Sequence, residues 1–111
     1  MQNSTGHGFW PNLIILLILI EQTDELFEQI EEMASLMLSK NEISTMLELD
    51  PDEFLEIMQD KTGKAYKRYQ TGRMKTITQV RKSVFELAGN GSSPAQTEAM
   101  KIIRESKMED I

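Results

Sequence analysis

The residues of this chain best suited to chemistry are its lysines and arginines, which are concentrated in one stretch. Residues 61–85 hold eight of the 12 basic residues and no acidic residue, whereas residues 1–60 hold 13 of the 18 acidic residues and one base, Lys40. The net charge of −6 therefore conceals a cationic segment inside an acidic chain. Basic side chains gathered in this way can neutralise phosphates and release their counterions. A solvated helix face, or pairing with the acidic segment of a neighbouring copy, would account for the same run.

The basic run supplies the candidate DNA-binding residues. In a heptad numbered from Tyr66 at position a, four bases share position c and two more lie beside them at position b. This spacing predicts one cationic stripe on the solvent side of a helix. The residues expected to contact the phosphates of double-stranded DNA are Lys61, Lys64, Lys67, Arg68, Lys75, Arg81 and Lys82.

The composition leaves little for an enzyme to use. The chain has no cysteine, which excludes disulfides and cysteine-ligated zinc. It has a single histidine, His7, which leaves little basis for histidine acid–base catalysis. The glycine-rich nucleotide-binding, nucleophile-elbow and zinc-protease motifs do not occur. We therefore expect a non-enzymatic protein with no catalytic, metal-ligating or cofactor-binding residues and no cofactor.

The elements that must position these bases start with three short helices. Thr23 is a candidate N-cap, residues 39–42 match a capping box, and Asp50 before Pro51 marks a third helix start. A small residue inside the second helix, Ser44, and an apolar residue in the following turn, Leu49, are typical of a helix-turn-helix. Residues 21–60 are therefore predicted to form a trihelical helix-turn-helix module.

The third helix of this module carries the wrong charge for a phosphate backbone. A recognition helix normally presents basic or polar side chains to the major groove. Here the side expected to be exposed carries Asp52, Glu53 and Glu56. We therefore expect the long basic helix to contact DNA more than the third helix does.

Residues 61–111 are predicted to form a helical hairpin. A long helix over residues 64–88 follows Gly63, with Gly72 as a candidate bend, and Gly89-Asn90-Gly91 ends it. Residues 93–96 match another capping box, so a last helix folds back antiparallel. The fold class is all-α: a trihelical bundle, a long helix and an antiparallel hairpin. The apolar seam expected to drive oligomerisation comprises Tyr66, Ile77, Val80, Val84 and Leu87.

The first twenty residues are unlike the rest, and their role is open. Residues 13–20 form an unbroken apolar run of eight, about 12 Å as a helix and far short of a bilayer core of about 30 Å. We expect no membrane span. The run is interpreted as a segment that docks on the body or as sequence upstream of the true domain, with weak membrane contact as a lesser alternative.

Several motifs resemble the small-terminase type of phage DNA-packaging protein. They are Ser39-Lys40-Asn41-Glu42-Ile43 with Leu49-Asp50, then Ala65-Tyr66-Lys67-Arg68-Tyr69-Gln70-Thr71-Gly72-Arg73, then Val84-Phe85-Glu86-Leu87-Ala88-Gly89-Asn90-Gly91. The resemblance covers about residues 25–107. It implies recognition of viral DNA, assembly into a ring through the hairpin, and handover of DNA to a large ATPase-nuclease subunit. A cytoplasmic location, in the host if the protein is viral, is the matching expectation.

Three functional interpretations follow from these observations. The first is a non-enzymatic DNA-packaging adaptor from a phage or prophage. The second is a small helix-turn-helix transcriptional regulator whose hairpin is a dimerisation arm. The third is a protein-interaction module that never contacts nucleic acid. A ring needs heterologous contacts and a regulator is usually a two-fold dimer, so subunit number separates the first two, and salt-dependent DNA binding separates both from the third.

Overall fold

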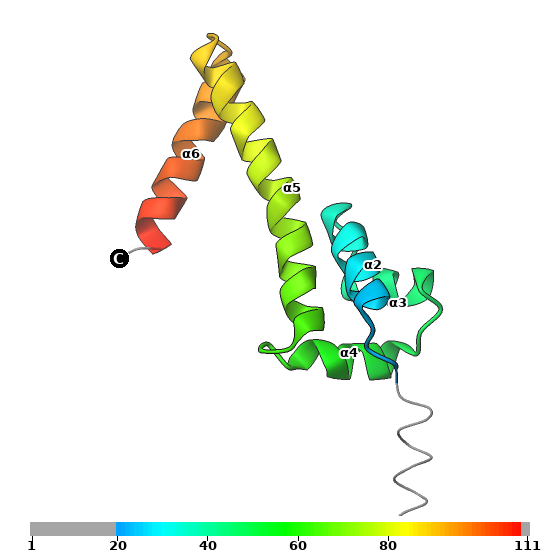
Figure 1. Ribbon diagram of the computed structural model, residues 1–111. Coiled ribbons are helices and arrows are strands. Elements are labelled where there is room, and N and C mark those ends of the chain that lie inside the picture. The colour runs from blue at the N-terminus through cyan, green and yellow to red at the C-terminus, as the bar shows by residue number, and fades with distance from the viewer. Residues whose placement is uncertain (1–19, 110–111) are drawn as a thin grey trace, which may run out of the picture.

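The computed structural model describes residues 20–109, which are helical throughout apart from short connections, with no strand (Figure 1). The helices are α2 (Asp24–Ser35), α3 (Lys40–Met46), α4 (Pro51–Gln59), α5 (Lys64–Gly89) and α6 (Ser93–Glu109). The predicted all-α class is confirmed. Residues 1–19, which include most of the apolar leader, lie outside the described residues.

The N-terminal ends of the first three helices are fixed by local side chains. The Thr23 hydroxyl accepts a hydrogen bond from the Leu26 amide at 3.1 Å, and Asp50 accepts one from the Glu53 amide at 3.0 Å. Ser39 and Glu42 form the complete reciprocal capping box. Each cap satisfies an amide that the first turn would otherwise leave unpaired, which confirms the predicted helix starts.

The connection from α3 to α4 is held by packing and hydrogen bonds at Ser44 and Leu49. Ser44 is fully buried, and its hydroxyl donates to the Asn41 carbonyl at 2.7 Å. The Leu49 amide donates to the Ser44 carbonyl at 2.8 Å, and the Leu49 side chain packs against the core. Glu48 completes this turn with φ of 56°, a left-handed conformation that a residue with a side chain adopts at a cost.

The core is shared by four helices, not three. Its buried residues come from α2, α3, α4 and the first half of α5, and they are Leu26, Phe27, Ile30, Ala34, Ile43, Phe54, Met58, Ala65 and Tyr69. The predicted domain boundary between residues 60 and 61 therefore divides the core. Three helices of 12, seven and nine residues leave their apolar stripes uncovered until α5 packs on them.

The crossing of α2 and α5 is unusually close because Gly72 lies at the contact. A Cβ atom on Gly72 would lie 2.9 Å from the Ala34 Cβ and would overlap the Glu31 carbonyl oxygen. The sequence suggested a bend at this glycine, but α5 runs as one helix from Lys64 to Gly89. The absence of a side chain at Gly72 allows the backbones of α2 and α5 to approach closely.

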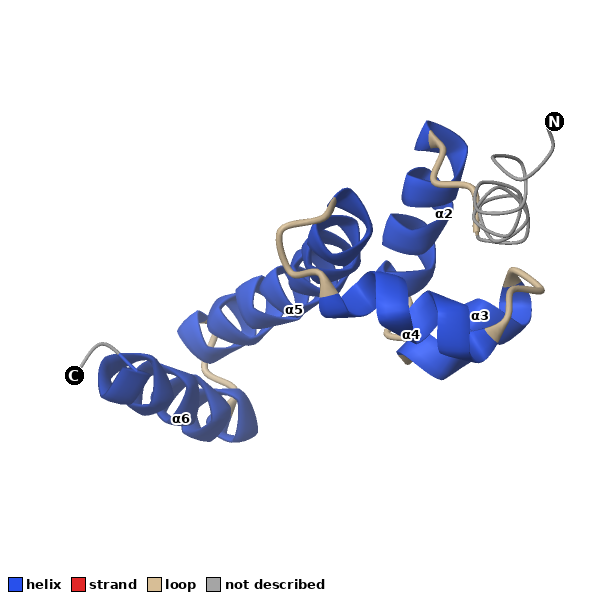
Figure 2. Ribbon diagram, turned by 90° about the horizontal axis from the view of Figure 1, so that it is seen from below, coloured by secondary structure: helices blue, strands red, loops and turns tan. Residues whose placement is uncertain are grey.

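The hairpin of α5 and α6 is an arm that extends away from the core. Figures 1 and 2 show α2, α3 and α4 gathered around one end of α5, while α6 meets α5 near its other end and then diverges. Gly91, with φ of +100°, supplies the left-handed residue in the turn. The cap of α6 is Ser92, whose hydroxyl lies 3.4 Å from the Ala95 amide, and not Ser93 as the sequence suggested.

Candidate nucleic-acid interface

Five of the seven predicted DNA-binding residues are exposed and form no ion pair within residues 20–109. Lys61, Lys64 and Lys67 lie around the start of α5, and Arg81 and Lys82 lie on the arm. They lie in two groups along α5, three around its start and two on the arm. Both groups can attract phosphate, since the chain places no acidic residue between positions 61 and 85.

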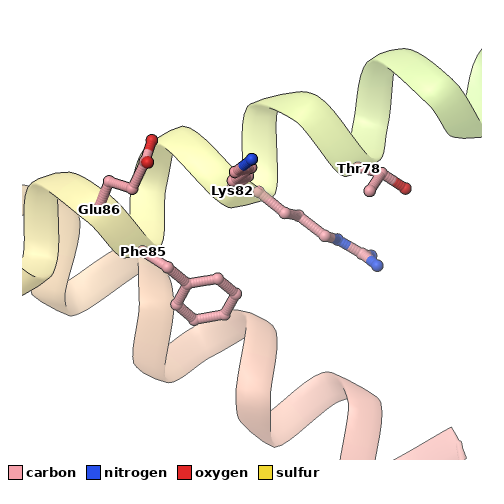
Figure 3. A pocket seen from close by; sticks show the side chains of 5 residues that line it. Thr78, Lys82, Phe85 and Glu86 are labelled. Carbon is pink, nitrogen blue, oxygen red and sulfur yellow. The ribbon is translucent and has the colours of Figure 1, made fainter.

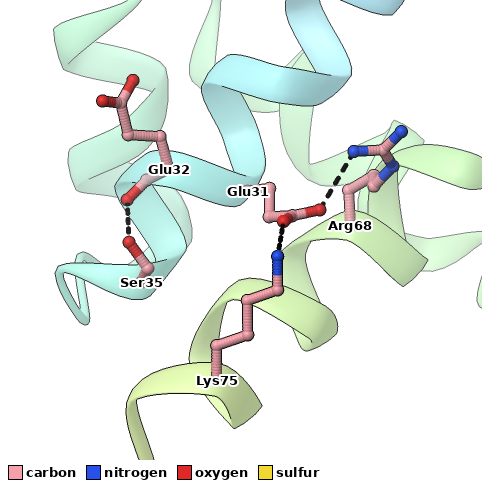
Figure 4. Close-up of polar contacts among 5 residues, drawn as sticks. All are labelled: Glu31, Glu32, Ser35, Arg68 and Lys75. Carbon is pink, nitrogen blue, oxygen red and sulfur yellow. Dashed lines mark hydrogen bonds and ion pairs between the residues drawn. The ribbon is translucent and has the colours of Figure 1, made fainter.

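The remaining two predicted residues, Arg68 and Lys75, face α2 and both pair with Glu31 (Figure 4). The guanidinium Nη1 of Arg68 lies 3.0 Å from Glu31 Oε1, and Lys75 donates to the other carboxylate oxygen. One heptad separates the two bases, so they lie on the same side of α5, and that side borders the crossing. Both residues are exposed, as the predicted stripe requires, and both are also paired with α2.

The two cations stabilise the ionised form of Glu31. The hydrogen bond from Lys75 is the largest influence that lowers the pKa of Glu31, and Arg68 adds to it, while partial burial opposes both. The Glu31 side chain is 18% exposed. Arg68 and Lys75 remain 46% and 63% exposed, so they keep contact with solvent while they hold α2 against α5.

A cation–aromatic cluster, which the sequence did not reveal as a unit, joins α3 to α5. Lys40 Nζ lies 5.9 Å from the Tyr66 ring centre and 5.6 Å from that of Tyr69, and the Arg73 guanidinium carbon lies 5.4 Å from the Tyr69 ring. Tyr66, which the sequence placed in the oligomerisation seam, is partly buried against the core of its own chain. The spacing of Tyr69 and Arg73, four residues apart on one helix, was the available signal.

Two α5 side chains bind carbonyls at or just after the C-terminal end of α2. Thr76 donates its hydroxyl to the Ser35 carbonyl, and Arg73 donates to the Leu38 carbonyl at 3.5 Å. The Ser35 carbonyl ends α2 and would otherwise lack a partner in the helix, whereas Leu38 lies in the connection to α3. Arg73 thus has a structural role and is not one of the unpaired cations.

The start of α5 is electropositive for a second reason. Its N-cap is Gly63, which provides no side-chain acceptor, and its first turn contains Lys64 and no acidic residue. Asp60 precedes this turn, and its Oδ1 accepts from the Thr62 hydroxyl at 2.7 Å and from the Thr62 amide at 3.1 Å. These bonds lower the pKa of Asp60 and occupy that oxygen in the turn, and the charge of Lys67 lowers the pKa further.

The helix that would read bases in a helix-turn-helix is acidic on its exposed side. Asp52 and Glu56 of α4 are exposed, Glu53 is partly buried, and α4 contains no basic residue. A phosphate backbone brought against this face meets carboxylates with no cation from the same helix between them.

The arm presents apolar side chains to solvent on more than one side. Val80 and Leu87 are 56% and 55% exposed, while Ile77 and Val84 are partly buried. On a different side of α5, a shallow groove is lined by Thr78, Arg81, Lys82, Phe85 and Glu86, with Phe85 43% exposed (Figure 3). Val80 and Leu87 are the members of the predicted seam that nothing within residues 20–109 covers.

Within residues 20–109, no helix has both the length and the apolar character to cross a membrane. In the same part of the chain, no three histidine or carboxylate side chains gather closely enough to hold a metal ion. Comparison of the chain with protein-family models, curated proteins and solved structures gives no match. The likeness to small terminase subunits therefore depends on short motifs within residues 39–91.

Proposed function

We propose that this chain is a non-enzymatic, oligomeric DNA-binding adaptor similar to a phage terminase small subunit, and that it assists packaging of a viral genome. The observation that carries the proposal is the set of five exposed, unpaired cations, Lys61, Lys64, Lys67, Arg81 and Lys82. They lie on a chain that is otherwise acidic, so their segregation is unlike the mixed charge of an ordinary solvated surface.

The binding is to phosphates and is insensitive to base sequence. Lysine contacts with phosphates position a protein on the duplex and carry no sequence information. The acidic exposed side of α4 makes insertion into the major groove unfavourable. The three lysines at the start of α5 form the primary contact, and Arg81 and Lys82 on the arm form a second contact.

Oligomerisation raises the affinity of such a weak module. Several copies held side by side present several lysine groups to one duplex, and each added contact is then intramolecular. The partners of the chain in this proposal are double-stranded DNA, further copies of itself and a large terminase ATPase-nuclease subunit.

The test is fluorescence anisotropy on duplex DNA at several salt concentrations. Replacement of Lys61, Lys64 and Lys67 by Gln in one chain should weaken binding to all sequences alike and flatten the salt dependence by about three units of slope, roughly one per lost contact. Replacement of Arg68 and Lys75 by Gln is the matched control, because both already pair with Glu31. That variant should change the slope by less than one unit.

The acidic helix gives the complementary measurement. Replacement of Glu53 and Glu56 by Gln should leave binding unchanged or strengthen it, because carboxylates repel phosphates. If these changes abolish binding while the triple lysine variant binds like wild type, α4 is the DNA-reading helix and the proposed contact is wrong. If wild type shows no salt-dependent binding, the chain is a protein-interaction module.

The second candidate function is a small transcriptional regulator. The packed α3–turn–α4 unit, with Ser44 buried and Leu49 in the corner, favours it. A regulator of this kind is usually a two-fold dimer, whereas a packaging adaptor forms a larger ring. The mass of the full chain by light scattering separates them.

A further inference from the structure

The stripe of α5 that packs on α2 continues beyond the end of α2. Ala65, Tyr69, Gly72 and Thr76 follow one another at intervals of four, three and four residues; Gly72 and Thr76 contact α2, and Ala65 and Tyr69 are buried in the core. The same intervals lead on to Val80, Ser83 and Leu87. Thr76 already contacts Ser35, the last residue of α2, so α2 does not extend along this continuation, and α6 meets α5 on another side (Figure 1).

The uncovered part of the stripe holds two exposed apolar residues, Val80 and Leu87, with the exposed Ser83 between them. Val80 and Leu87 are each more than half exposed, and Leu36, directly after α2, is 69% exposed. Ser83, Glu86, Leu87 and Asn90 line a shallow pocket on α5. A helix or strand that continued the path of α2 would cover this surface and complete the stripe.

The chain contains one unassigned segment of matching character, residues 13–19, which lead directly into Ile20. With Ile20 they form an uncharged apolar run of eight residues. As a helix this run is about 12 Å long, close to the distance of about 10 Å from Val80 to Leu87 along α5. Its length therefore suits the uncovered surface.

The run cannot cover the whole of this surface within its own chain. Ile20 packs against the core just before α2, and the 12 residues of α2 carry the chain about 18 Å along α5 before the uncovered stripe begins. A further distance of about 16 Å separates Thr76 from Leu87. Seven residues extend at most about 24 Å, so a run from the same chain cannot cover Leu87.

We infer that residues 13–19 of one copy pack on Val80 and Leu87 of a neighbouring copy. The inference names the contact behind the self-association in the proposed function, and it is independent of whether the chain binds DNA. The contact is heterologous, because the donating segment and the accepting stripe are different parts of the chain, so it can propagate around a ring.

The test is disulfide cross-linking of the full chain, which contains no cysteine of its own. Leu16→Cys on one copy, mixed with Val80→Cys on a second copy of distinguishable mass, should form a mixed disulfide at least tenfold faster than Leu16→Cys mixed with Thr78→Cys. Thr78 is the control because it is exposed on a different side of α5. Equal rates for Val80→Cys and Thr78→Cys would overturn the inference.

A chain that carries both Leu16→Cys and Val80→Cys distinguishes exchange between copies from docking within one. It should give disulfide-linked oligomers on a non-reducing gel, at protein concentrations where wild type self-associates. A disulfide closed within a single chain would show that the run folds back on its own copy and would contradict the exchange.

Light scattering of full-length variants gives a second test of the contact, through its effect on self-association. Leu16→Asp and Val80→Asp should each weaken self-association at least tenfold, and the double variant should be no weaker than either alone. If Leu16→Asp associates like wild type while Val80→Asp does not, the stripe binds another surface and the exchange fails, although the oligomeric adaptor remains. If wild type is monomeric throughout, both proposals fail.

Discussion

At the scale of single residues, Gly72 and Glu31 determine how closely α2 packs on α5 and which side of α5 faces it. Gly72 removes the side chain that would separate the two backbones, and Glu31 accepts hydrogen bonds from two bases on α5. A helix-interior glycine is normally a weakness, yet here the close packing that it allows offsets the loss of helix propensity. Each residue leads to a measurable prediction.

Gly72→Ala should destabilise the protein although alanine favours helices. The new Cβ would overlap the Glu31 carbonyl and lie 2.9 Å from the Ala34 Cβ, so the helices must move apart. We expect the free energy of unfolding, measured by urea denaturation, to fall by about 2 kcal/mol or more, as for an overpacked core. Gly89→Ala is the control, because a Cβ atom at that position would meet nothing within 4 Å; it should be neutral or stabilising by up to about 1 kcal/mol. Equal stability of Gly72→Ala and wild type would show that the crossing is not close.

Glu31 should make stability depend on pH in the acid range. Its pKa lies below the ordinary value of 4.5, so the folded state binds fewer protons than the unfolded state between those two values. The contribution of Glu31 to stability is therefore complete above pH 4.5 and is lost as the pH falls through its folded pKa. Glu31→Gln should be less stable at neutral pH, and its difference from wild type should shrink as the pH falls below 4.5.

Thermal unfolding at a series of pH values measures this difference. Glu28→Gln removes the same charge from an exposed position that forms no ion pair within residues 20–109. Its pH profile should follow that of wild type. A constant difference between Glu31→Gln and wild type across the acid range would argue against the pairing with Arg68 and Lys75.

At the scale of elements, the short helices are defined by their ends and the turns between them. Caps at Thr23, Ser39 and Asp50 set where α2, α3 and α4 begin. Two turns instead use residues with side chains in the left-handed region, Met37 with φ of 65° and Glu48 with φ of 56°. Such residues cost about 1–2 kcal/mol relative to ordinary helical backbone, so these turns are held by the packing around them.

Glu48→Gly should stabilise the turn between α3 and α4. Glycine adopts a positive φ without steric cost, and this gain exceeds its larger loss of chain entropy on folding. We expect the free energy of unfolding to rise by up to about 1 kcal/mol in chemical denaturation. Glu56→Gly, at an exposed position inside α4, should lower it by about 1 kcal/mol. A loss of stability in both variants would mean that the turn does not gain from glycine.

At the scale of the whole molecule, α5 belongs to both the core and the arm. Its first half contributes Ala65 and Tyr69 to the core, and its second half carries α6 and the exposed Val80 and Leu87. The arm is therefore a direct extension of the core through one unbroken helix. Any contact made by the arm is rigidly related to the cations at the start of α5.

A chain that ends at residue 60 should not fold cooperatively, because the core then lacks α5. A chain that ends at residue 78 keeps Ala65, Tyr69, Gly72 and Thr76 in place and should fold with a cooperative transition. Circular dichroism during thermal unfolding distinguishes the two. A cooperative transition for the shorter chain would restore the trihelical module as an independent domain.

The sequence by itself determined the helices of residues 20–109, because caps, turn residues and apolar spacing act over three or four positions. It located the capping box at Ser39, the start at Pro51 and the inward-facing Ser44 and Leu49. The start of the last helix was displaced by one residue, since Ser92 and Ser93 are equally good caps as sequence.

Only the tertiary structure decided which side of α5 faces α2, and therefore which bases are available. The heptad spacing grouped Arg68 and Lys75 correctly on one side, but it could not show that Glu31 lies opposite them. That orientation follows from the close contact of Gly72 with Ala34 and the Glu31 backbone, between residues about forty positions apart. Periodicity along one helix defines its faces, whereas the neighbour of each face depends on packing between distant segments.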